Sequence, residues 1–179
     1  MRVYISDIKE SKEAQLAIEW GASAVGLRIG YGLDDVHPEK AREIFMSIPL
    51  FVSRVGIFNN EKRYNIQELI TFCHLDSVHY TGSETPDELK DYSEHLIKNF
   101  SAEQVKDIPQ YPVEAVCINI DRETCLMRSM LPQDKKLIVS GIQKLDDWWK
   151  NILIDFQPFA VKIPMAEAGR ELVRNLLVL

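Results

Sequence analysis

Eight short apolar runs recur along the chain and give the first indication of its architecture. They are rich in valine, isoleucine and phenylalanine, and several are apolar at successive positions rather than at alternating ones. Strands that are covered on both faces read in this way, because neither face meets water. We therefore expect eight buried strands. They lie within residues 3–8, 24–29, 51–58, 77–80, 95–100, 113–118, 136–140 and 159–163.

Helical patterns lie between most of these runs. Ser11 is placed to cap a helix over residues 12–20, and Gly21 is placed to end it. Pro38 opens a second helix that runs to about Ser47. Capping boxes, in which the side chain of the third helical residue bonds back to the capping residue, begin at two further positions, Thr85 and Ser101. The box at Ser101 precedes a helix that we expect to be short.

Strands that alternate with helices predict a parallel sheet whose strands are joined by helical crossovers. Eight strands in 179 residues leave about 22 residues for each strand–helix unit. A closed eight-stranded barrel is compatible with that spacing, although it is small beside the ~250 residues usual for this fold. An open doubly wound sheet is the other arrangement, and periodicity does not separate the two. No linker, low-complexity segment or internal repeat marks a second domain, so we expect residues 1–179 to form one domain.

The composition excludes several classes of partner. Hydrophobic residues make up 46% of the chain and the net charge is -6, so we expect no surface for nucleic acid or an anionic membrane. No apolar run reaches the ~18 residues of a membrane span, and the first residues lack the apolar core of a signal peptide. Cys73, Cys117 and Cys125 show no CxxC spacing, which argues against a zinc site or a disulfide scaffold. We expect a cytoplasmic protein that uses no metal and no cofactor.

Three segments in the first half of the chain follow the pattern of one known family. They read RVYISDIKESKEAQLAIEWGASAVG (2–26), HPEKAREIFMSIPLFVSRVGIFNN (37–60) and LDSVHYTGSETPDEL (75–89). Shorter stretches follow the same pattern more weakly: VEAVCIN (113–119), LIVSGI (137–142) and PFAVKI (158–163). The chain resembles phosphoribosylanthranilate isomerase, an enzyme of the tryptophan pathway. This resemblance implies a compact α/β fold, the (β/α)8 TIM barrel, in place of the open sheet.

The resemblance also implies an intramolecular aldose–ketose isomerisation, the Amadori rearrangement of an aminoaldose phosphate. Such a reaction needs a general base on one face of the substrate and a general acid on the other. The family's basic cysteine corresponds to Ser6 and its acidic aspartate to Asn119, and neither residue can do the same task alone. Asp7 and Asp121 are the candidate substitutes. Asp7 faces away from Ser6 unless the strand ends in a turn, and Asp121 is either the acid or an exposed loop residue.

The phosphate-binding segments that the resemblance implies are altered as well. Paired glycines in the family let backbone N–H groups approach the phosphate, whereas here only Gly141 remains, beside Ser140. A later serine–glycine turn is replaced by a segment that begins with Pro164, which has no N–H to donate. A glycine-rich loop of the family is replaced by residues 122–134, which contain no glycine. We therefore expect the fold to be kept while the site is replaced.

Lys162 stands where the family has an aspartate. Its amine follows three apolar residues, so it is placed either to act as a nucleophile or base, or to form a salt bridge with Asp121 or Asp7. Arg28 is placed either to hold a carboxylate or phosphate, or to extend outward into water. His79 lies at a strand end, either as a hydrogen-bonded structural residue or as a base.

These observations lead to one expectation and two alternatives. We expect an isomerase-like barrel whose activity is lost or altered, and which binds a small anionic or zwitterionic molecule. The alternatives are an active isomerase that uses Ser6 or Asp7 with Asp121, and an enzyme with new chemistry built on Lys162. Monomer and homodimer both stay open, with the tryptophan pair at 148–149 as a candidate contact. The candidate binding residues share a position near the carboxyl ends of strands: Arg28, His79, Asn119, Ser140, Gly141 and Lys162.

Overall fold

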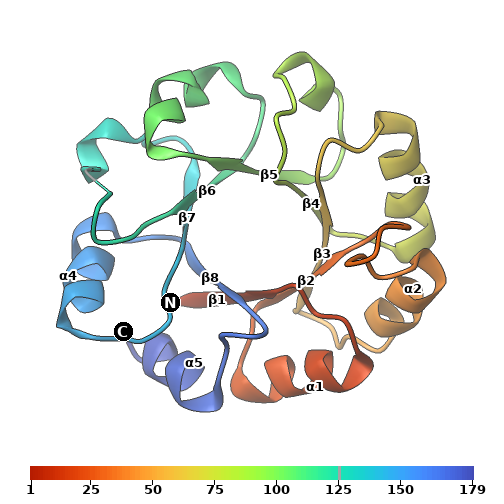
Figure 1. Ribbon diagram of the computed structural model, residues 1–179, viewed down its shortest axis with the longest axis horizontal. Coiled ribbons are helices and arrows are strands. Elements are labelled where there is room, and N and C mark those ends of the chain that lie inside the picture. Colours follow the sequence, from red (N-terminus) through yellow and green to blue (C-terminus); the bar gives the residue numbers. More distant parts are fainter. Residues whose placement is uncertain (125) are drawn as a thin grey trace.

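Eight parallel strands close into a barrel in their chain order, β1 to β8, with helices around the outside (Figure 1). The structure is a computed structural model that describes residues 1–124 and 126–179. Each predicted apolar run overlaps one strand, and the closed order of the strands confirms the expected TIM barrel. The strands are β1 (Arg2–Ser6), β2 (Ala24–Arg28), β3 (Ser53–Phe58), β4 (Ser77–Tyr80), β5 (His95–Phe100), β6 (Ala115–Asn119), β7 (Lys136–Ser140) and β8 (Ala160–Pro164).

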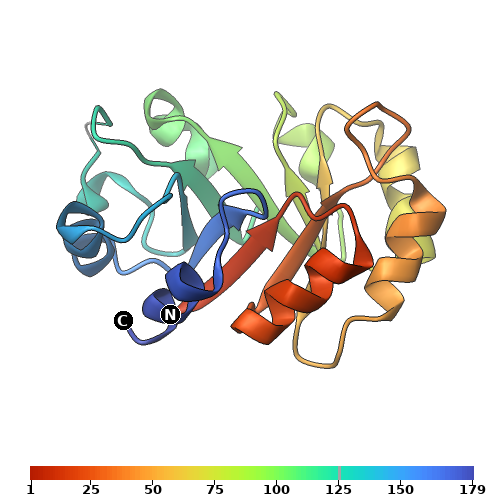
Figure 2. The same ribbon diagram turned by 60° about the horizontal axis from the view of Figure 1, so that its bottom comes forward.

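The helices are distributed unevenly around the barrel. The α-helices follow strands near the two ends of the chain: α1 (Ser11–Trp20), α2 (Pro38–Met46), α3 (Arg63–Cys73), α4 (Asp147–Phe156) and α5 (Arg170–Leu177). The connections between β4 and β7 contain 3-10 helices instead: η1 (Asp87–Leu89), η2 (Ala102–Gln110) and η3 (Arg128–Met130). These shorter crossovers explain how a closed barrel fits into so few residues. Figure 2 shows the outer helices from the side, with the two ends of the chain close together.

The two ends of α1 agree only in part with the caps that the sequence predicted. Gly21 ends α1 with φ of 107°, a left-handed conformation that glycine adopts without strain. The expected N-cap at Ser11 is wrong, because Ser11 is already helical and Glu10 is the capping residue. The carboxylate of Glu13 accepts hydrogen bonds from the backbone N–H groups of Lys9 and Glu10, at 2.7 and 3.1 Å. The Glu13 carboxylate therefore satisfies backbone donors at the start of the helix, and Ser11 has no capping role.

The predicted capping box at Ser101 forms, whereas at Thr85 only the bonds to the Glu88 side chain form, and both segments are 3-10 rather than α-helical. The backbone N–H and the hydroxyl of Thr85 each donate to the Glu88 carboxylate at 2.7 Å. The backbone N–H of Ser101 donates to the Gln104 side chain at 3.0 Å. Pro109 lies inside the second segment, and its missing N–H is incompatible with a regular helix there.

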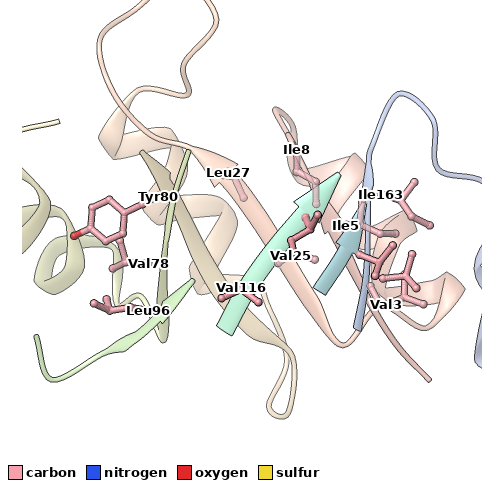
Figure 3. Packing of buried hydrophobic residues seen from close by; sticks show 14 of the residues in the cluster. Val3, Ile5, Ile8, Val25, Leu27, Val78, Tyr80, Leu96, Val116 and Ile163 are labelled. Carbon is pink, nitrogen blue, oxygen red and sulfur yellow. The ribbon is translucent and has the colours of Figure 1, made fainter. Parts of the chain in front are cut away.

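The hydrophobic core has two parts, one on each face of the barrel wall. Outward-facing strand residues such as Val3, Val25 and Val116 are buried beneath the surrounding helices, and Figure 3 shows part of this cluster. A second cluster fills the lumen and consists of Tyr4, Val55, Ile57, Ile97, Ala115, Cys117, Ile138 and Ala160. Both faces of each strand are therefore covered, as the continuous apolar runs predicted.

The pairing register sorts the inward-facing side chains into layers of four from alternate strands, as is usual in this fold. The lower layer is Tyr4, Val55, Ile97 and Ile138. The middle layer is Gly26, His79, Cys117 and Lys162. The upper layer is Ser6, Ile57, Asn99 and Ser140. The lumen thus changes from apolar to polar toward the carboxyl ends of the strands, which form the mouth of the barrel.

Among the residues that the structure describes, no helix is long and apolar enough to cross a membrane.

Candidate functional site

A hydrogen-bonded chain crosses the middle of the lumen from β1 to β5. The Tyr4 hydroxyl lies 3.2 Å from Nδ1 of His79, and Nε2 of His79 lies 2.8 Å from Oδ1 of Asn99. Burial, together with the positive charge of Lys162, lowers the pKa of His79 to about 3, so the imidazole is neutral at pH 7. Burial raises the pKa of Tyr4, so its hydroxyl keeps its proton.

The neutral imidazole and the carbonyl oxygen of Asn99, which can only accept, together fix the direction of both hydrogen bonds. A neutral imidazole has one donor nitrogen and one acceptor nitrogen. The Tyr4 hydroxyl donates to Nδ1 of His79, and Nε2–H of His79 donates to the Asn99 carbonyl oxygen. His79 is fully buried and both of its ring nitrogens are engaged within the protein.

Lys162 lies in the same layer as His79 and reaches the lumen from β8. Its side chain is half-buried. Within the described part of the chain, no carboxylate lies within 4.0 Å of its Nζ and no acceptor forms a hydrogen bond with it. The salt bridge to Asp121 or Asp7 that the sequence left open is therefore not observed. Lys162 contributes an uncompensated positive charge close to His79 and Cys117.

Ser6, Asp7 and Arg28 form a second polar group at the ends of β1 and β2. Ser6 is fully buried, and its hydroxyl donates to the Asp7 carboxylate at 2.6 Å. Asp7 has φ of 58°, a left-handed conformation that aspartate tolerates better than most residues. This turn brings its carboxylate back toward Ser6, which the alternation of a regular strand does not allow. The guanidinium of Arg28 lies 3.5 Å from the other oxygen of Asp7, so Arg28 is already paired with a carboxylate.

Asp7 and Arg28 also border a cleft of about 580 Å³ beside the mouth. The loop that follows β2 provides its opposite wall, including Gly32, Asp34 and Asp35. Lys9 crosses the cleft to Asp34, with 3.7 Å between Nζ and Oδ1. The cleft therefore carries both signs of charge at the edge of the lumen.

Asp121 lies outside the lumen, in the loop after β6. Its carboxylate accepts hydrogen bonds from the Thr124 hydroxyl at 2.7 Å and the Glu123 backbone N–H at 3.0 Å. These bonds hold the pKa of Asp121 below its usual range and use the carboxylate to stabilise a local turn. The role of Asp121 as an acid stays a prediction, and it requires the carboxylate to leave this turn.

Asn119, Ser140 and Gly141 lie together at the ends of β6 and β7. The Ser140 hydroxyl is 3.4 Å from the Asn119 carbonyl oxygen, so the contact is weak. Gly141 has φ of 104°, and a side chain there would collide with the backbone oxygen of Ile120. Glycine is thus required at position 141 by the close approach of two loops.

The most buried charges near the mouth were not predicted as a pair. Lys98 and Glu84 are 3% and 4% exposed, and Nζ lies 2.9 Å from Oε2. Lys98 also donates to the Gly82 carbonyl at 2.7 Å, and Glu84 accepts the Asn60 backbone N–H at 2.8 Å. The pair fixes the loops after β3 and β4, and its charge is compensated. No local sequence pattern relates these two residues, because Glu84 lies in the loop after β4 and Lys98 lies 14 residues later, on β5.

The described residues contain no group of three or more histidines, cysteines or acidic residues arranged to hold a metal ion. Cys73 and Cys117 are buried free thiols, and Cys125 lies outside the described residues. Within residues 1–124 and 126–179, the polar layers of the lumen therefore offer hydrogen-bond donors and the unpaired amine of Lys162 as their chemistry.

No protein-family model matches the chain. Curated relatives do match: N-(5'-phosphoribosyl)anthranilate isomerase from Moorella thermoacetica is 36% identical over 98 residues, covering 55% of this chain and 44% of the relative. The same enzyme from Desulforamulus reducens is 31% identical over 122 residues, covering 66% and 59% of the two chains. The chain resembles phosphoribosylanthranilate isomerase. It spans about half the length of the curated relatives it matches.

The fold agrees with that resemblance over a longer stretch. A solved phosphoribosylanthranilate isomerase, in complex with reduced 1-(o-carboxyphenylamino)-1-deoxyribulose 5-phosphate, superimposes with a TM-score of 0.79. The match covers 97% of this chain and 95% of the isomerase, at 22% identity. At that identity the likeness shows the shared barrel and does not transfer the ligand.

Proposed function

We propose that residues 1–179 act as one isomerase-like barrel domain that binds a small anionic molecule at its mouth and has lost the isomerase's proton transfers. The observation that carries this proposal is the pair of residues at the positions where the resemblance implies base and acid. Ser6 is a buried hydroxyl and Asn119 is an amide. An amide has no proton to transfer at neutral pH, and a serine hydroxyl needs a base of its own.

The anionic character of the ligand follows from the charges in the lumen. Lys162 has no carboxylate partner among the described residues, whereas Lys98 and Arg28 are each paired with one. A half-buried cation without a counter-charge attracts an anion, because the protein interior screens charge less than water does. The candidate binding residues Asn119, Ser140 and Gly141 surround the same opening.

Genetic complementation tests the loss of the reaction. A bacterial strain that lacks phosphoribosylanthranilate isomerase is transformed with this chain and plated without tryptophan, beside a strain carrying an active isomerase. The proposal predicts no growth from this chain while immunoblotting shows soluble protein at a level similar to that of the control. Growth at the rate of the control contradicts it.

One contact favours a second candidate, an active isomerase with substituted groups. The 2.6 Å bond between Ser6 and Asp7 places a carboxylate beside the position of the family's base. In this case Asp7 is the base and Asp121 the acid. The same growth test then becomes positive, and growth is lost in both Asp7→Asn and Asp121→Ala. Growth that survives both substitutions excludes this candidate.

The partner-free amine of Lys162 favours a third candidate, new chemistry on that lysine. An amine nucleophile forms an imine with a carbonyl compound, and borohydride reduces the imine to a stable adduct. Incubation with pyruvate and borohydride, followed by peptide mass spectrometry, locates any adduct. Modification of Lys162 well above that of Lys12, an exposed lysine on α1, supports this candidate, and equal modification of the two contradicts it.

A further inference from the structure

The middle and upper layers of the lumen place mostly polar side chains beneath the mouth, and we call these two layers the polar well. Gly26 and Cys117, the other members of the middle layer, are small, so the layer is not filled by bulky apolar groups as the lower layer is. A side chain at Gly26 would collide with the Tyr4 hydroxyl, which shows that the tip of Tyr4 occupies this space and reaches the level of His79. The floor of the well is therefore the Tyr4–His79 pair.

The Asn99 side chain has a defined orientation above this floor. Its carbonyl oxygen accepts Nε2–H of His79 at 2.8 Å, so its NH2 group is left for other partners. Among the residues described, that NH2 group has no hydrogen-bond acceptor. Nζ of Lys162, in the layer below, has none either. Two donor groups from different walls of the well are thus unpaired, and one of them is charged.

The other cations near the mouth do not compete for a ligand in the same way. Arg28 contacts Asp7, which in turn accepts the Ser6 hydroxyl. Lys98 is buried against Glu84. Lys162 therefore supplies a single uncompensated charge, which a monovalent anion with two acceptor oxygens matches better than a phosphate dianion.

We propose that this well binds a carboxylate group, held by the Lys162 ammonium and the Asn99 amide, with His79 and Tyr4 as positioning residues. The proposal rests on the proposed function and deepens it, because it names the class of ligand and the atoms that recognise it. Lys162 and Asn99 touch the ligand. His79 acts through Asn99, since its Nε2–H keeps the amide oxygen pointing down and the NH2 group pointing toward the ligand.

NMR titration of the full chain with acetate tests the binding residues, with inorganic phosphate as the comparison anion. Lys162→Met keeps the length of the side chain without its charge, and Asn99→Asp keeps the oxygen that accepts from His79 but replaces the donor with a negative charge. Each is expected to weaken acetate binding by roughly tenfold or more, because each removes a charge-assisted contact. The matched controls Lys12→Met and Asn151→Asp make the same chemical changes on exposed helix surfaces and are expected to bind like the natural chain.

The outcomes separate this inference from the proposed function. If acetate or phosphate binds at the mouth and neither Lys162→Met nor Asn99→Asp weakens acetate, the carboxylate site is overturned while an anion-binding barrel stands. Tighter binding of phosphate than acetate also overturns it. If neither anion binds the natural chain, both proposals fail.

The positioning role of His79 has its own test. His79→Gln can still donate to the Asn99 oxygen, whereas His79→Leu cannot. Acetate affinity is expected to survive in the first variant and fall in the second, and the Asn99 side-chain NH2 resonances are expected to shift on acetate addition only where binding survives. Equal acetate affinity in His79→Leu and the natural chain contradicts the role, since a folded variant would then orient Asn99 without the imidazole.

Discussion

The lower and upper layers of the lumen are built by the same four strands, β1, β3, β5 and β7, yet their side chains differ in kind. Tyr4, Val55, Ile97 and Ile138 pack the lower layer with mainly apolar groups. Two residues further along each of those four strands, the layer becomes Ser6, Ile57, Asn99 and Ser140, which is mostly polar. The lower layer maintains the barrel, whereas the upper one faces the mouth, where sites of this fold lie. A site can therefore change residue by residue while the scaffold beneath it stays the same.

The largest loss of stability near the mouth is expected at the buried pair of Lys98 and Glu84, which lies outside the lumen. Lys98→Met leaves Glu84 as a buried charge without its partner, and we expect a loss of about 3–5 kcal/mol in the free energy of unfolding. Urea denaturation followed by circular dichroism measures it. The double variant Lys98→Met/Glu84→Gln removes both charges and is expected to be more stable than the single variant. A double variant less stable than the single one contradicts the account of the pair.

The two lumen layers can be compared directly on β7. Ile138→Ala leaves a cavity in the lower layer, and we expect a loss of about 2–5 kcal/mol in the free energy of unfolding. Its matched partner in the upper layer is Ser140→Ala. Urea midpoints and slopes for the two variants, measured side by side, give the comparison. Similar losses for both variants would remove the distinction between a layer that stabilises the barrel and a layer that is free to change.

The buried imidazole at the boundary of the two layers predicts a pH dependence. In the unfolded chain His79 takes up a proton below its ordinary pKa of about 6.5. In the folded chain its pKa is about 3, so the folded state stays neutral over that interval and binds fewer protons. Stability is therefore expected to fall as pH decreases from 6.5 toward 3, by about 1.4 kcal/mol for each pH unit from this residue alone.

The difference in unfolding free energy between the natural chain and His79→Gln isolates this contribution, because the carboxylates titrate in both. Between pH 6.5 and pH 4.5, the natural chain is expected to lose more unfolding free energy than His79→Gln does. An identical pH profile for the two proteins contradicts the neutral, buried state of His79.

Ser140→Ala is expected to have the smallest effect of the set. The hydroxyl makes only long contacts, at 3.4 Å to both the Ile118 backbone oxygen and the Asn119 side chain. Its removal is expected to cost about 0.5 kcal/mol or less in the free energy of unfolding. Thermal unfolding at fixed pH measures this, and a loss as large as that of Ile138→Ala would show that the upper layer also carries the stability of the barrel.

The sequence predicted the scaffold better than the site for a physical reason. Strand positions follow from apolar runs, because burial on both faces leaves a pattern in neighbouring residues. The cap at Glu10 and the 3-10 crossovers after β4 were missed, since short helices depend on local hydrogen bonds more than on periodicity. The turn at Asp7 was named as a condition but not predicted, because it depends on a single left-handed residue.

For the site residues, too, the sequence predicted positions along the strands better than it predicted contacts between side chains. The resemblance located Ser6 and Asn119 at strand ends, where the structure has them, whereas Lys162 lies within β8. It gave no information on the partners of these side chains. The bond of His79 to Tyr4 joins residues 75 positions apart, on β4 and β1, so only the folded barrel brings them together. The contact of Lys98 with Glu84 depends on how the loop after β4 folds back onto β5, which the sequence does not show.

Turnover of the isomerase's substrate tests the central claim most directly, that the barrel was kept while its proton-transfer chemistry was replaced. Phosphoribosylanthranilate is generated in situ, and the loss of its fluorescence is followed with purified chain, with an active isomerase as the positive control and without enzyme. The account predicts a rate no greater than the background, from protein that circular dichroism shows to be folded. A clear rate that disappears in Asp7→Asn would contradict it, and would show that the chemistry was rebuilt around Ser6 and Asp7 instead.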